Sequence, residues 1–317
     1  MFEKIETVDF YINYVCGIRC THCFIGENLN SNIEMPLEQI KIIVSDLKHR
    51  DVKCITLLGG EPSLHKNIND VISFIIKNGM GVRVVSNGQK PFQKMIKSLN
   101  EDEKSKLKVC FSIDGSNAEI NNSIRGKNVF ENLLDSIQLV QNNNIQYSGI
   151  TSISKDNFSD VESIINTSYE LGMEYLNIHY VTDRGFALKN KVVDVTLWKG
   201  LIKKLENSKN EIPIRIEKTF VSLDRNVTCE VNKKENIIID PNGFIFGCTM
   251  FMNRNQLASA KYINGEITIS QQSKNESTIC KCVKSGCPAI PLINNDIFNE
   301  ALSQELKFDC IFNKTTL

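Results

Sequence analysis

The 317-residue sequence lacks any run of about 18 apolar residues, which is the length that a membrane-spanning helix needs. Residues 1–6 also lack the basic start and apolar stretch of a secretory signal. Neither sign of charge is in excess, because 37 Lys and Arg residues balance 37 Asp and Glu residues. A dedicated nucleic-acid binder needs a basic surplus for its phosphate contacts. These absences predict a cytoplasmic protein with no membrane and no nucleic acid as its partner.

Internal repeats and low-complexity tracts are missing too, whereas cysteine is abundant, with 11 residues. A reducing compartment keeps thiols unpaired, so a cysteine-rich cytoplasmic chain more often binds metal or carries out redox chemistry. The cysteines form two groups, at residues 16–23 and 229–310. Cys54 and Cys110 stand alone in apolar runs, and we interpret both as small buried hydrophobic residues of strands.

Short apolar strands alternate with amphipathic helices over the first two thirds of the chain, which predicts an α/β fold. About six strand–helix units with short connections require a parallel sheet with right-handed crossovers. Periodicity leaves open whether the sheet is flat or a partial barrel, and both place the chemistry at the carboxyl ends of the strands. The predicted strands are residues 8–15, 54–58, 81–86, 107–113, 146–153 and 175–181, and the predicted helices are 36–50, 68–77, 92–99, 129–141 and 161–171.

The rhythm changes after about residue 195. A helix over 197–205 and a strand over 212–216 are followed by a predicted β-hairpin, 237–246, around a Pro-Asn-Gly turn. The remainder is rich in loops and cysteines. We therefore divide the chain into residues 1–211 and residues 212–317.

The first cysteine group has the spacing Cys16-x3-Cys20-x2-Cys23 and directly follows the first predicted strand. Three thiolates are one short of the set that a [4Fe–4S] cluster normally takes. A structural zinc with His22 as fourth ligand is an alternative. A redox pair of two cysteines is another, but it leaves Cys16 unexplained. An iron–sulfur cluster with three ligands has one open position, which is typical of catalytic sites.

This cysteine loop after the first strand of a βα repeat resembles that of the radical S-adenosylmethionine (SAM) enzymes. In that family SAM binds the fourth iron through its amino and carboxylate groups. Gly59-Gly60-Glu61-Pro62 follows the second strand and resembles the family's glycine-rich SAM-binding motif. The glycines allow close approach of the backbone, and Glu61 could accept a charge-assisted hydrogen bond from the SAM ammonium. Taken alone, these four residues are also typical of a plain turn.

Further motifs follow the later strands in the family's order. Ser86-Asn87-Gly88 resembles the polar tripeptide beside the SAM. Ser112-Ile113-Asp114-Gly115 with Arg125-Gly126 resembles the pattern of the branch that modifies peptides and small metabolites. By this resemblance Ser112 and Arg125 hold the SAM carboxylate or ribose. A plain turn and a solvated surface arginine are the alternative interpretations.

The resemblance also implies weaker contacts from the later loops, from Ser152 and Ser154 to the ribose and from Arg184-Gly185 to the site. The fold that the resemblance implies is a partial (β/α)6 TIM-like barrel. In this chain we expect a small cysteine-rich domain of a β-hairpin plus loops to follow it. The residues expected to bind SAM are Gly59, Gly60, Glu61, Ser86, Asn87, Ser112, Asp114, Arg125 and Ser152.

The second cysteine group resembles the auxiliary-cluster extension of these enzymes, the SPASM or shorter twitch domain. Cys229-x13-Gly243-x4-Cys248 fits its first half, whereas Cys280-x-Cys282-x4-Cys287 departs from the C-x2-C-x5-C-x3-C of its second half. Six candidates are too few for the roughly eight ligands of two full clusters. We therefore expect one auxiliary [4Fe–4S] cluster, held by Cys229, Cys248 and two of Cys280, Cys282 and Cys287.

Other arrangements of these thiols stay open. Cys310 lies in an apolar tail and is first interpreted as a buried thiol. A second, incomplete cluster of Cys280, Cys282, Cys287 and Cys310 is one alternative, and a structural zinc is another. A thiol that binds no iron, Cys280 or Cys310, could donate a hydrogen atom.

The resemblance implies a reaction as well. SAM on the open iron receives one electron, from a donor such as flavodoxin or ferredoxin, and yields methionine and a 5′-deoxyadenosyl radical that abstracts a substrate hydrogen. The cofactor carries the hard chemistry, and the protein positions the substrate and excludes solvent. An auxiliary cluster that accepts an electron suits an oxidative product, such as a crosslink or a dehydrogenated group. Epimerisation needs a hydrogen donor instead.

Three functions follow from this pattern. The first is the crosslinking or epimerisation of a ribosomally synthesised peptide. The second is a small-molecule dehydrogenase or epimerase that acts on an aminocyclitol or sugar. The third is a non-catalytic iron–sulfur electron carrier, against which the ordered SAM motifs argue. Because the cysteine loop begins at residue 16, the peptide hypothesis also predicts a separate leader-binding partner.

Overall fold

The computed structural model describes residues 5–187, 189–227, 229, 235–252, 254–263, 265–269, 287, 295–310 and 314–317. Two predicted cluster ligands, Cys280 and Cys282, lie outside these residues. Cys280 was also predicted as a candidate hydrogen donor.

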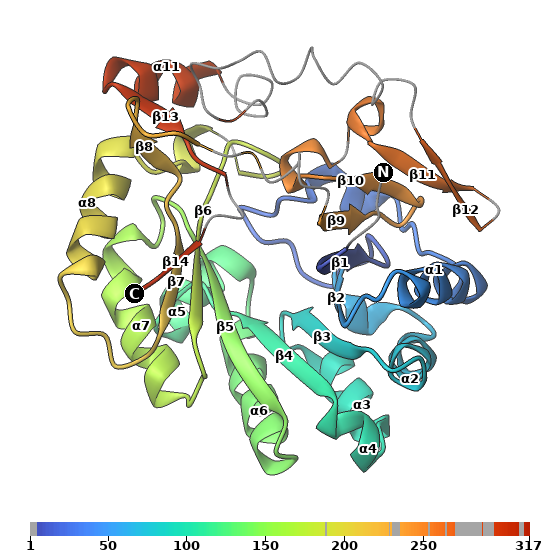
Figure 1. Ribbon diagram of the computed structural model, residues 1–317. Helices are drawn as coiled ribbons and strands as arrows, with labels where there is room; N and C mark the ends of the chain where they lie inside the picture. Colours follow the sequence, from blue (N-terminus) through green and yellow to red (C-terminus); the bar gives the residue numbers. More distant parts are fainter. Residues whose placement is uncertain are drawn as a thin grey trace.

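Parallel strands pair in chain order, from β1 to β7, and form a curved sheet (Figure 1). Each strand alternates between its two faces. In β3, for example, Val82 and Val84 are buried toward the helices, whereas Arg83 and Val85 point to the other face and are partly exposed. The strands are β1 (Thr7–Tyr11), β2 (Cys54–Leu58), β3 (Gly81–Ser86), β4 (Leu107–Ser112), β5 (Gln146–Ile153), β6 (Leu176–Tyr180) and β7 (Ile214–Glu217).

Helices cover the outer face of this sheet, as Figure 1 shows, and the inner face is left to the site. In α1 the buried residues are Ile40, Ile43, Val44 and Leu47, which have the helical spacing of the sequence. The prediction of an α/β partial barrel is confirmed. The helices are α1 (Leu37–His49), α2 (Ile68–Lys77), α3 (Lys90–Ser98), α4 (Glu101–Ser105), α5 (Ala118–Arg125), α6 (Val129–Asn142), α7 (Val161–Glu170), α8 (Val195–Glu206) and α11 (Asn295–Ser303).

Two details of the prediction were wrong. The first strand was predicted over residues 8–15, but β1 ends at Tyr11, because the chain then leaves the sheet to form the cysteine loop. The short helices α4 and α5 were missed. Both are polar, and each begins at an asparagine cap, Asn100 and Asn117, whose side-chain oxygen accepts a backbone hydrogen bond.

The later part of the chain extends the same sheet at both edges. The predicted hairpin is confirmed as β9 (Asn236–Ile239) and β10 (Phe244–Phe246), and β9 pairs in parallel with β1. At the other edge β14 (Lys314–Thr316) pairs antiparallel with β7. The sheet therefore has no break at residue 212, and the division into 1–211 and 212–317 stays a prediction. The hairpin continues into β11 (Ala260–Ile263) and β12 (Glu266–Ile269).

An aromatic cluster joins the C-terminal segment to the barrel. Strands β8 (Phe220–Ser222) and β13 (Leu306–Phe308) pair with each other beside α8. The ring centroids of Tyr180 and Trp198 are 5.0 Å apart, those of Tyr180 and Phe220 are 5.6 Å apart, and those of Phe220 and Phe308 are 4.9 Å apart. Such edge-to-face pairs stabilise beyond the area that they bury.

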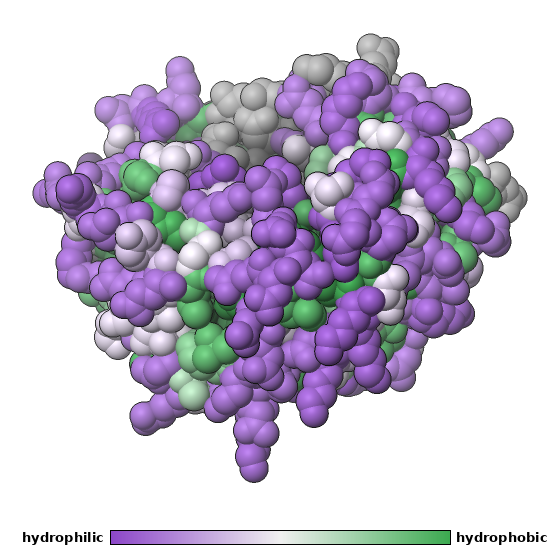
Figure 2. All heavy atoms as spheres, turned by 90° about the horizontal axis from the view of Figure 1, so that it is seen from below, coloured by the Kyte–Doolittle hydropathy of each residue, from purple (hydrophilic) through white to green (hydrophobic). Residues whose placement is uncertain are grey.

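The face of the molecule seen from below is largely polar (Figure 2). Figure 2 shows the molecule from below, where hydrophilic side chains cover most of the face and apolar residues are scattered between them. Within the described residues, every helix is too short or too polar to cross a membrane.

Candidate active site

The predicted cluster ligands lie together at the carboxyl edge of the parallel sheet, in the loop after β1. Burial raises the pKa of Cys16 to about 12, and the nearby charges of Glu61, Cys20 and Cys23 add to this rise. Burial likewise raises the pKa of Cys20 to about 11. The three thiols are close neighbours without a disulfide between them. Thiols with raised pKa values release their protons when they bind a metal.

The contact made by His22 argues against a zinc site in which His22 is the fourth ligand. A zinc ion needs all its ligands within about 2.0–2.3 Å. His22, the proposed fourth zinc ligand, instead directs its Nε2 to the carboxylate of Asp114 at 2.9 Å. Three neighbouring thiols are the ligand type that a [4Fe–4S] cluster with one open corner takes.

The glycine-rich loop after β2 packs directly against the cysteine loop. A Cβ on Gly60 would lie 2.4 Å from the carbonyl oxygen of Val15 and 3.0 Å from Cys16 Cβ. Two backbone hydrogen bonds fix this contact: Gly60 N donates to Asn13 O at 3.0 Å, and Glu61 N donates to Val15 O at 2.7 Å. Gly60 is therefore required because the backbone of the glycine-rich loop lies so close to the cysteine loop.

The Glu61 carboxylate connects the glycine-rich loop to the end of β3. Its Oε1 accepts hydrogen bonds from Ser63 N (3.2 Å), Ser63 Oγ (2.7 Å) and Ser86 Oγ (3.0 Å), and its Oε2 accepts one from Asn87 N (2.8 Å). Asn87 Nδ2 in turn lies 3.8 Å from Cys16 Sγ. All four contacts of the carboxylate go to protein groups, and the predicted contact of Glu61 with the SAM ammonium stays a prediction.

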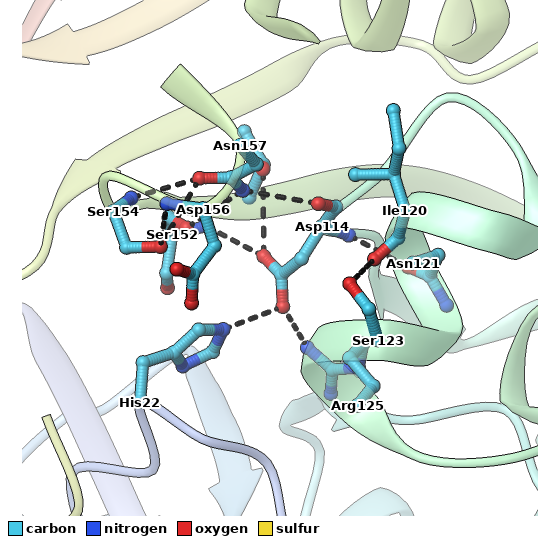
Figure 3. Close-up of polar contacts among 11 residues, drawn as sticks. His22, Asp114, Ile120, Asn121, Ser123, Arg125, Ser152, Ser154, Asp156 and Asn157 are labelled. Atoms are coloured by element: carbon cyan, nitrogen blue, oxygen red, sulfur yellow. Dashed lines mark hydrogen bonds and ion pairs between the residues drawn. The ribbon is translucent and has the colours of Figure 1, made fainter. Parts of the chain in front are cut away.

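Asp114 is the centre of a polar network at the ends of β4 and β5 (Figure 3). Its Oδ2 accepts from His22 Nε2 and forms an ion pair with Arg125, and its Oδ1 accepts from Ser152 N at 2.8 Å. Burial alone would raise the pKa of Asp114, but His22 and Arg125 lower it below its usual range. The side chain is 1% exposed, so this carboxylate organises the protein around it.

Arg125 carries a hydrogen-bond donor that the protein leaves unused. Its guanidinium is buried and pairs with Asp114 through Nη1, whereas Nε has no hydrogen-bond partner among the described residues. The charge of Arg125 also lowers the pKa of Cys20, so it lies beside the cysteine loop. A buried unsatisfied donor costs about 1–3 kcal/mol, which an anionic ligand would recover. This donor beside three thiols fits the carboxylate of SAM.

Sequence reasoning missed two members of this network and gave a third, His22, a different role. Asn121 Oδ1 accepts from Asp114 N at 2.9 Å, and Asn157 Nδ2 donates to Asp114 O at 3.0 Å. Neither asparagine lies in a motif, so only the fold identifies them. His22 was considered as a zinc ligand; its position between Cys20 and Cys23 was the signal that it belongs to the site.

The other predicted contacts differ in their surroundings. Ser112 ends β4 and is partly exposed, and Ser152 lines a cavity in the barrel. Ser154 is buried, and its Oγ accepts a hydrogen bond from Asp156 N at 3.2 Å within its own turn. The Ser154 side chain therefore stabilises its own loop. Contacts of any of these residues with SAM stay predictions.

Arg184 and Gly185 tie the loop after β6 to both cysteine groups. Phe186 N donates to Cys23 O at 2.9 Å, and a Cβ on Gly185 would lie 2.0 Å from the same oxygen. The Arg184 guanidinium lies 4.6 Å from the ring centroid of Phe24. It also donates to the carbonyl oxygens of the segment that follows Cys248, at Thr249, Met250 and Met252.

Four cysteines of the second group lie near one another in the described residues. Burial raises the pKa of Cys248 well above its usual value, and Cys287, Cys310 and Cys229 add to this rise, in that order. The predicted ligands Cys229, Cys248 and Cys287 are thus neighbours, and Cys310 joins them. Which thiols bind iron, and whether they hold one cluster, stay predictions.

A cavity of about 440 Å³ lies inside the barrel, beside the polar network. It is lined by inward-facing residues of the strands, among them His22 and Ser152 of the site. Cys110 is buried in β4 as predicted, but it also lines this cavity. The sequence did not single out the charged residues of the wall, although polar residues at alternate positions of apolar strands were a signal. They are Asp9, Arg83, His179, Arg215, Glu217 and Lys314.

Comparisons with known proteins point to one family. Residues 10–167 match the model of the radical SAM superfamily. AlbA of Bacillus subtilis (strain 168), an antilisterial bacteriocin subtilosin biosynthesis protein, is 23% identical over 245 residues, or 76% of this chain and 54% of AlbA. Fe-coproporphyrin III synthase of Methanosarcina barkeri (strain Fusaro / DSM 804) is 24% identical over 236 residues, or 74% of this chain and 56% of the synthase.

The chain thus spans about half the length of these curated relatives. Among solved structures, Streptococcus suis SuiB bound to precursor peptide SuiA is similar, with a TM-score of 0.66 and 14% identity over 83% of this chain and 63% of SuiB. At this identity the likeness shows a shared fold.

Proposed function

Because the chain belongs to the radical SAM superfamily, we propose that it is an enzyme that cleaves SAM reductively and removes a hydrogen atom from a ribosomally synthesised peptide. The observation that carries the proposal is the three-thiol loop, held between Gly60 and the Asp114–Arg125 pair beside a cavity. When bound, the family's [4Fe–4S] cluster and SAM supply a 5′-deoxyadenosyl radical, which abstracts the hydrogen.

The residues of the chain have distinct tasks in this proposal. Cys16, Cys20 and Cys23 hold the cluster and leave one corner for SAM. Arg125 binds the SAM carboxylate through its unsatisfied Nε, and Asp114 holds the guanidinium in place. A buried ion pair of this kind positions a charge without the freedom of a surface arginine.

A second set of residues keeps the loops in register. Glu61 connects the glycine-rich loop to Ser86 and Asn87 through its four hydrogen bonds. Ser112 and Ser152, at the ends of β4 and β5, would contact the ribose. The cavity wall then excludes water and presents the substrate C–H bond to the reacting carbon.

The cysteine-rich C-terminal region fits a SPASM-like domain, and we propose that it holds one auxiliary [4Fe–4S] cluster. Cys229, Cys248 and Cys287 would be ligands, with Cys280 or Cys282 as the fourth. Such a cluster supplies an electron acceptor, which suits a crosslink. Epimerisation would require a thiol that binds no iron, Cys280 or Cys310. A flavodoxin or ferredoxin as electron donor and a separate leader-binding protein belong to the same proposal.

A peptide substrate is supported by the relatives, because AlbA serves bacteriocin biosynthesis and SuiB is seen with its precursor peptide. A second candidate is a small-molecule substrate. The similarity to Fe-coproporphyrin III synthase favours it, since that alignment covers nearly as much of the chain as the alignment with AlbA.

The first test is the release of 5′-deoxyadenosine from SAM by anaerobically purified, reduced protein. Wild-type protein should release it, and Cys20→Ser should not. Cys54→Ser is the matched control, because Cys54 begins β2 away from the cysteine loop, and it should behave as the wild type. Zinc in place of iron, or no release by iron-loaded protein, would refute the proposal.

The second test separates the substrates. Candidate precursor peptides are incubated with the loaded enzyme in D2O and analysed by mass spectrometry. A crosslink removes two hydrogens, whereas epimerisation introduces one deuterium at the altered carbon. Turnover of a porphyrin or sugar with no change in any peptide would favour the small-molecule candidate.

A further inference from the structure

A chain of polar contacts crosses the cavity wall formed by β6, β7 and β14, outside every motif discussed above. Lys314 Nζ donates to His179 Nε2 at 3.0 Å, and His179 Nδ1 donates to Glu217 Oε1 at 3.2 Å. The other oxygen of Glu217 accepts from Tyr180 N at 3.1 Å. All four residues line the cavity. Pairing of β14 with β7 therefore places a lysine beside the substrate space.

The charges along this chain favour a cation at its exposed end. Burial lowers the pKa of His179 well below its usual value, and Lys314 lowers it further, so the imidazole is neutral. Burial raises the pKa of Glu217 to about 7, although Lys314 opposes the rise. Neutral His179 accepts a hydrogen bond from one of the three N–H donors of the Lys314 ammonium, which leaves two N–H donors for other partners. Lys314 is exposed, so these donors are available to a ligand.

Arg83 adds a second cation to the same space. It lines the cavity from β3, and its side chain forms no hydrogen bond or ion pair with any residue that the structure describes. Asp9 of β1 lies near both cations, because Lys314 and Arg83 each lower its pKa, which burial raises to about 6. Arg215 also lines the wall, with its guanidinium 3.8 Å from the Tyr175 ring centroid. Positive groups thus outnumber Asp9 and Glu217.

We propose that the cavity binds a carboxylate group of the substrate, with Lys314 and Arg83 as its partners. A charge enters a partly buried site at low cost only if it is paired and hydrogen-bonded there. The surplus cations meet that requirement for a carboxylate and oppose a cationic group. The inference rests on the proposed function, because it takes this cavity as the place of the substrate. The carboxylate could belong to an acidic side chain or to the end of a peptide.

The test compares short peptides that differ in one carboxylate. The SAM-loaded holoenzyme is titrated calorimetrically with acetyl-Ala-Ala-Glu-Ala-Ala-amide and with its Gln counterpart, which probes a side chain. Acetyl-pentaalanine as free acid and as amide probes a C-terminal carboxylate. We expect one acid to bind about tenfold more tightly than its amide, as one charge-assisted contact provides. The acid that shows the preference identifies the source of the group.

Variants then assign the preference to residues. Lys314→Met and Arg83→Met should each abolish it, and Lys314→Arg should retain it. Lys108→Met is the matched control, because Lys108 is paired in register with Arg83 but does not line the cavity, and it should keep the preference. Melting curves verify that each variant is folded, and the two methionine variants provide independent tests if one of them is not.

The outcomes separate this inference from the proposed function. Equal affinity for acids and amides, no binding of any peptide, or a preference that survives in both methionine variants would overturn the carboxylate site. Release of 5′-deoxyadenosine without peptide is measured on the same wild-type preparation. Its failure would refute radical chemistry and leave the binding result standing.

Discussion

Gly185 offers a quantitative test of how the loop after β6 supports the cysteine loop. Its φ is +60°, and a Cβ there would lie 2.0 Å from Cys23 O and 2.7 Å from Phe24 O. An L-residue in the left-handed region costs about 1–2 kcal/mol. Overpacking against backbone that cannot move aside costs about 1–3 kcal/mol more. We therefore expect Gly185→Ala to lower the free energy of unfolding by about 2–5 kcal/mol.

Two other glycines separate these contributions. Gly79 follows α2 with φ +81°, and a Cβ there would meet no other atom within 4 Å, so Gly79→Ala carries the conformational cost alone. Alanine also lowers the conformational entropy of the unfolded chain, which offsets part of this cost. The net loss in the free energy of unfolding should therefore be about 1 kcal/mol. Gly200 lies within α8 with neither constraint, and Gly200→Ala should stabilise by about 0.5–1 kcal/mol.

The assay is anaerobic urea denaturation of the three iron-loaded variants beside the wild type. The midpoints should fall in the order Gly200→Ala, wild type, Gly79→Ala, Gly185→Ala. Iron content should fall only in Gly185→Ala, because Cys23 must shift to make room. If Gly185→Ala and Gly79→Ala unfold at the same urea concentration, the contact with Cys23 carries no energy and the reasoning is refuted.

Three further predictions concern buried charge and metal content. Asp114→Ala leaves Arg125 buried without its counter-ion and should cost about 3–5 kcal/mol in urea denaturation, and an unchanged midpoint would contradict the network. Burial raises the pKa of Asp9 from 3.8 to about 6, so folding favours its protonated form and the contribution of Asp9 to stability should fall as the pH rises through this range. Asp9→Asn should remove this contribution and stabilise the protein relative to the wild type by up to about 3 kcal/mol at pH 7 but not at pH 4, measured as the difference between the two midpoints at each pH. Cys248→Ser should reduce the iron content from about eight to about four per chain, and an iron assay that finds no loss would argue against the auxiliary cluster.

The local sequence was sufficient for the elements and for the order of the motifs along them. The apolar positions of α1 repeat at helical spacing, and the Pro-Asn-Gly turn ends β9 with Gly243 at φ +80°. Because parallel strands end at one edge, the cysteine loop and the glycine-rich loop could be expected to meet there. Where polar residues form a helix, as in α5, periodicity gave no signal and the element was missed.

The tertiary structure alone decided what the motif residues contact. Glu61 accepts its hydrogen bonds from Ser63, Ser86 and Asn87, and His22 turns to Asp114, 92 residues away, although the sequence allowed both to serve a ligand or a metal. Lys314 and His179 are 135 residues apart and meet only because β14 pairs with β7. Propensity and periodicity act over a few residues, whereas these contacts depend on the order of strands in the sheet. The identity of the chemistry was therefore determined locally, and the shape and charge of the substrate space were set by the fold.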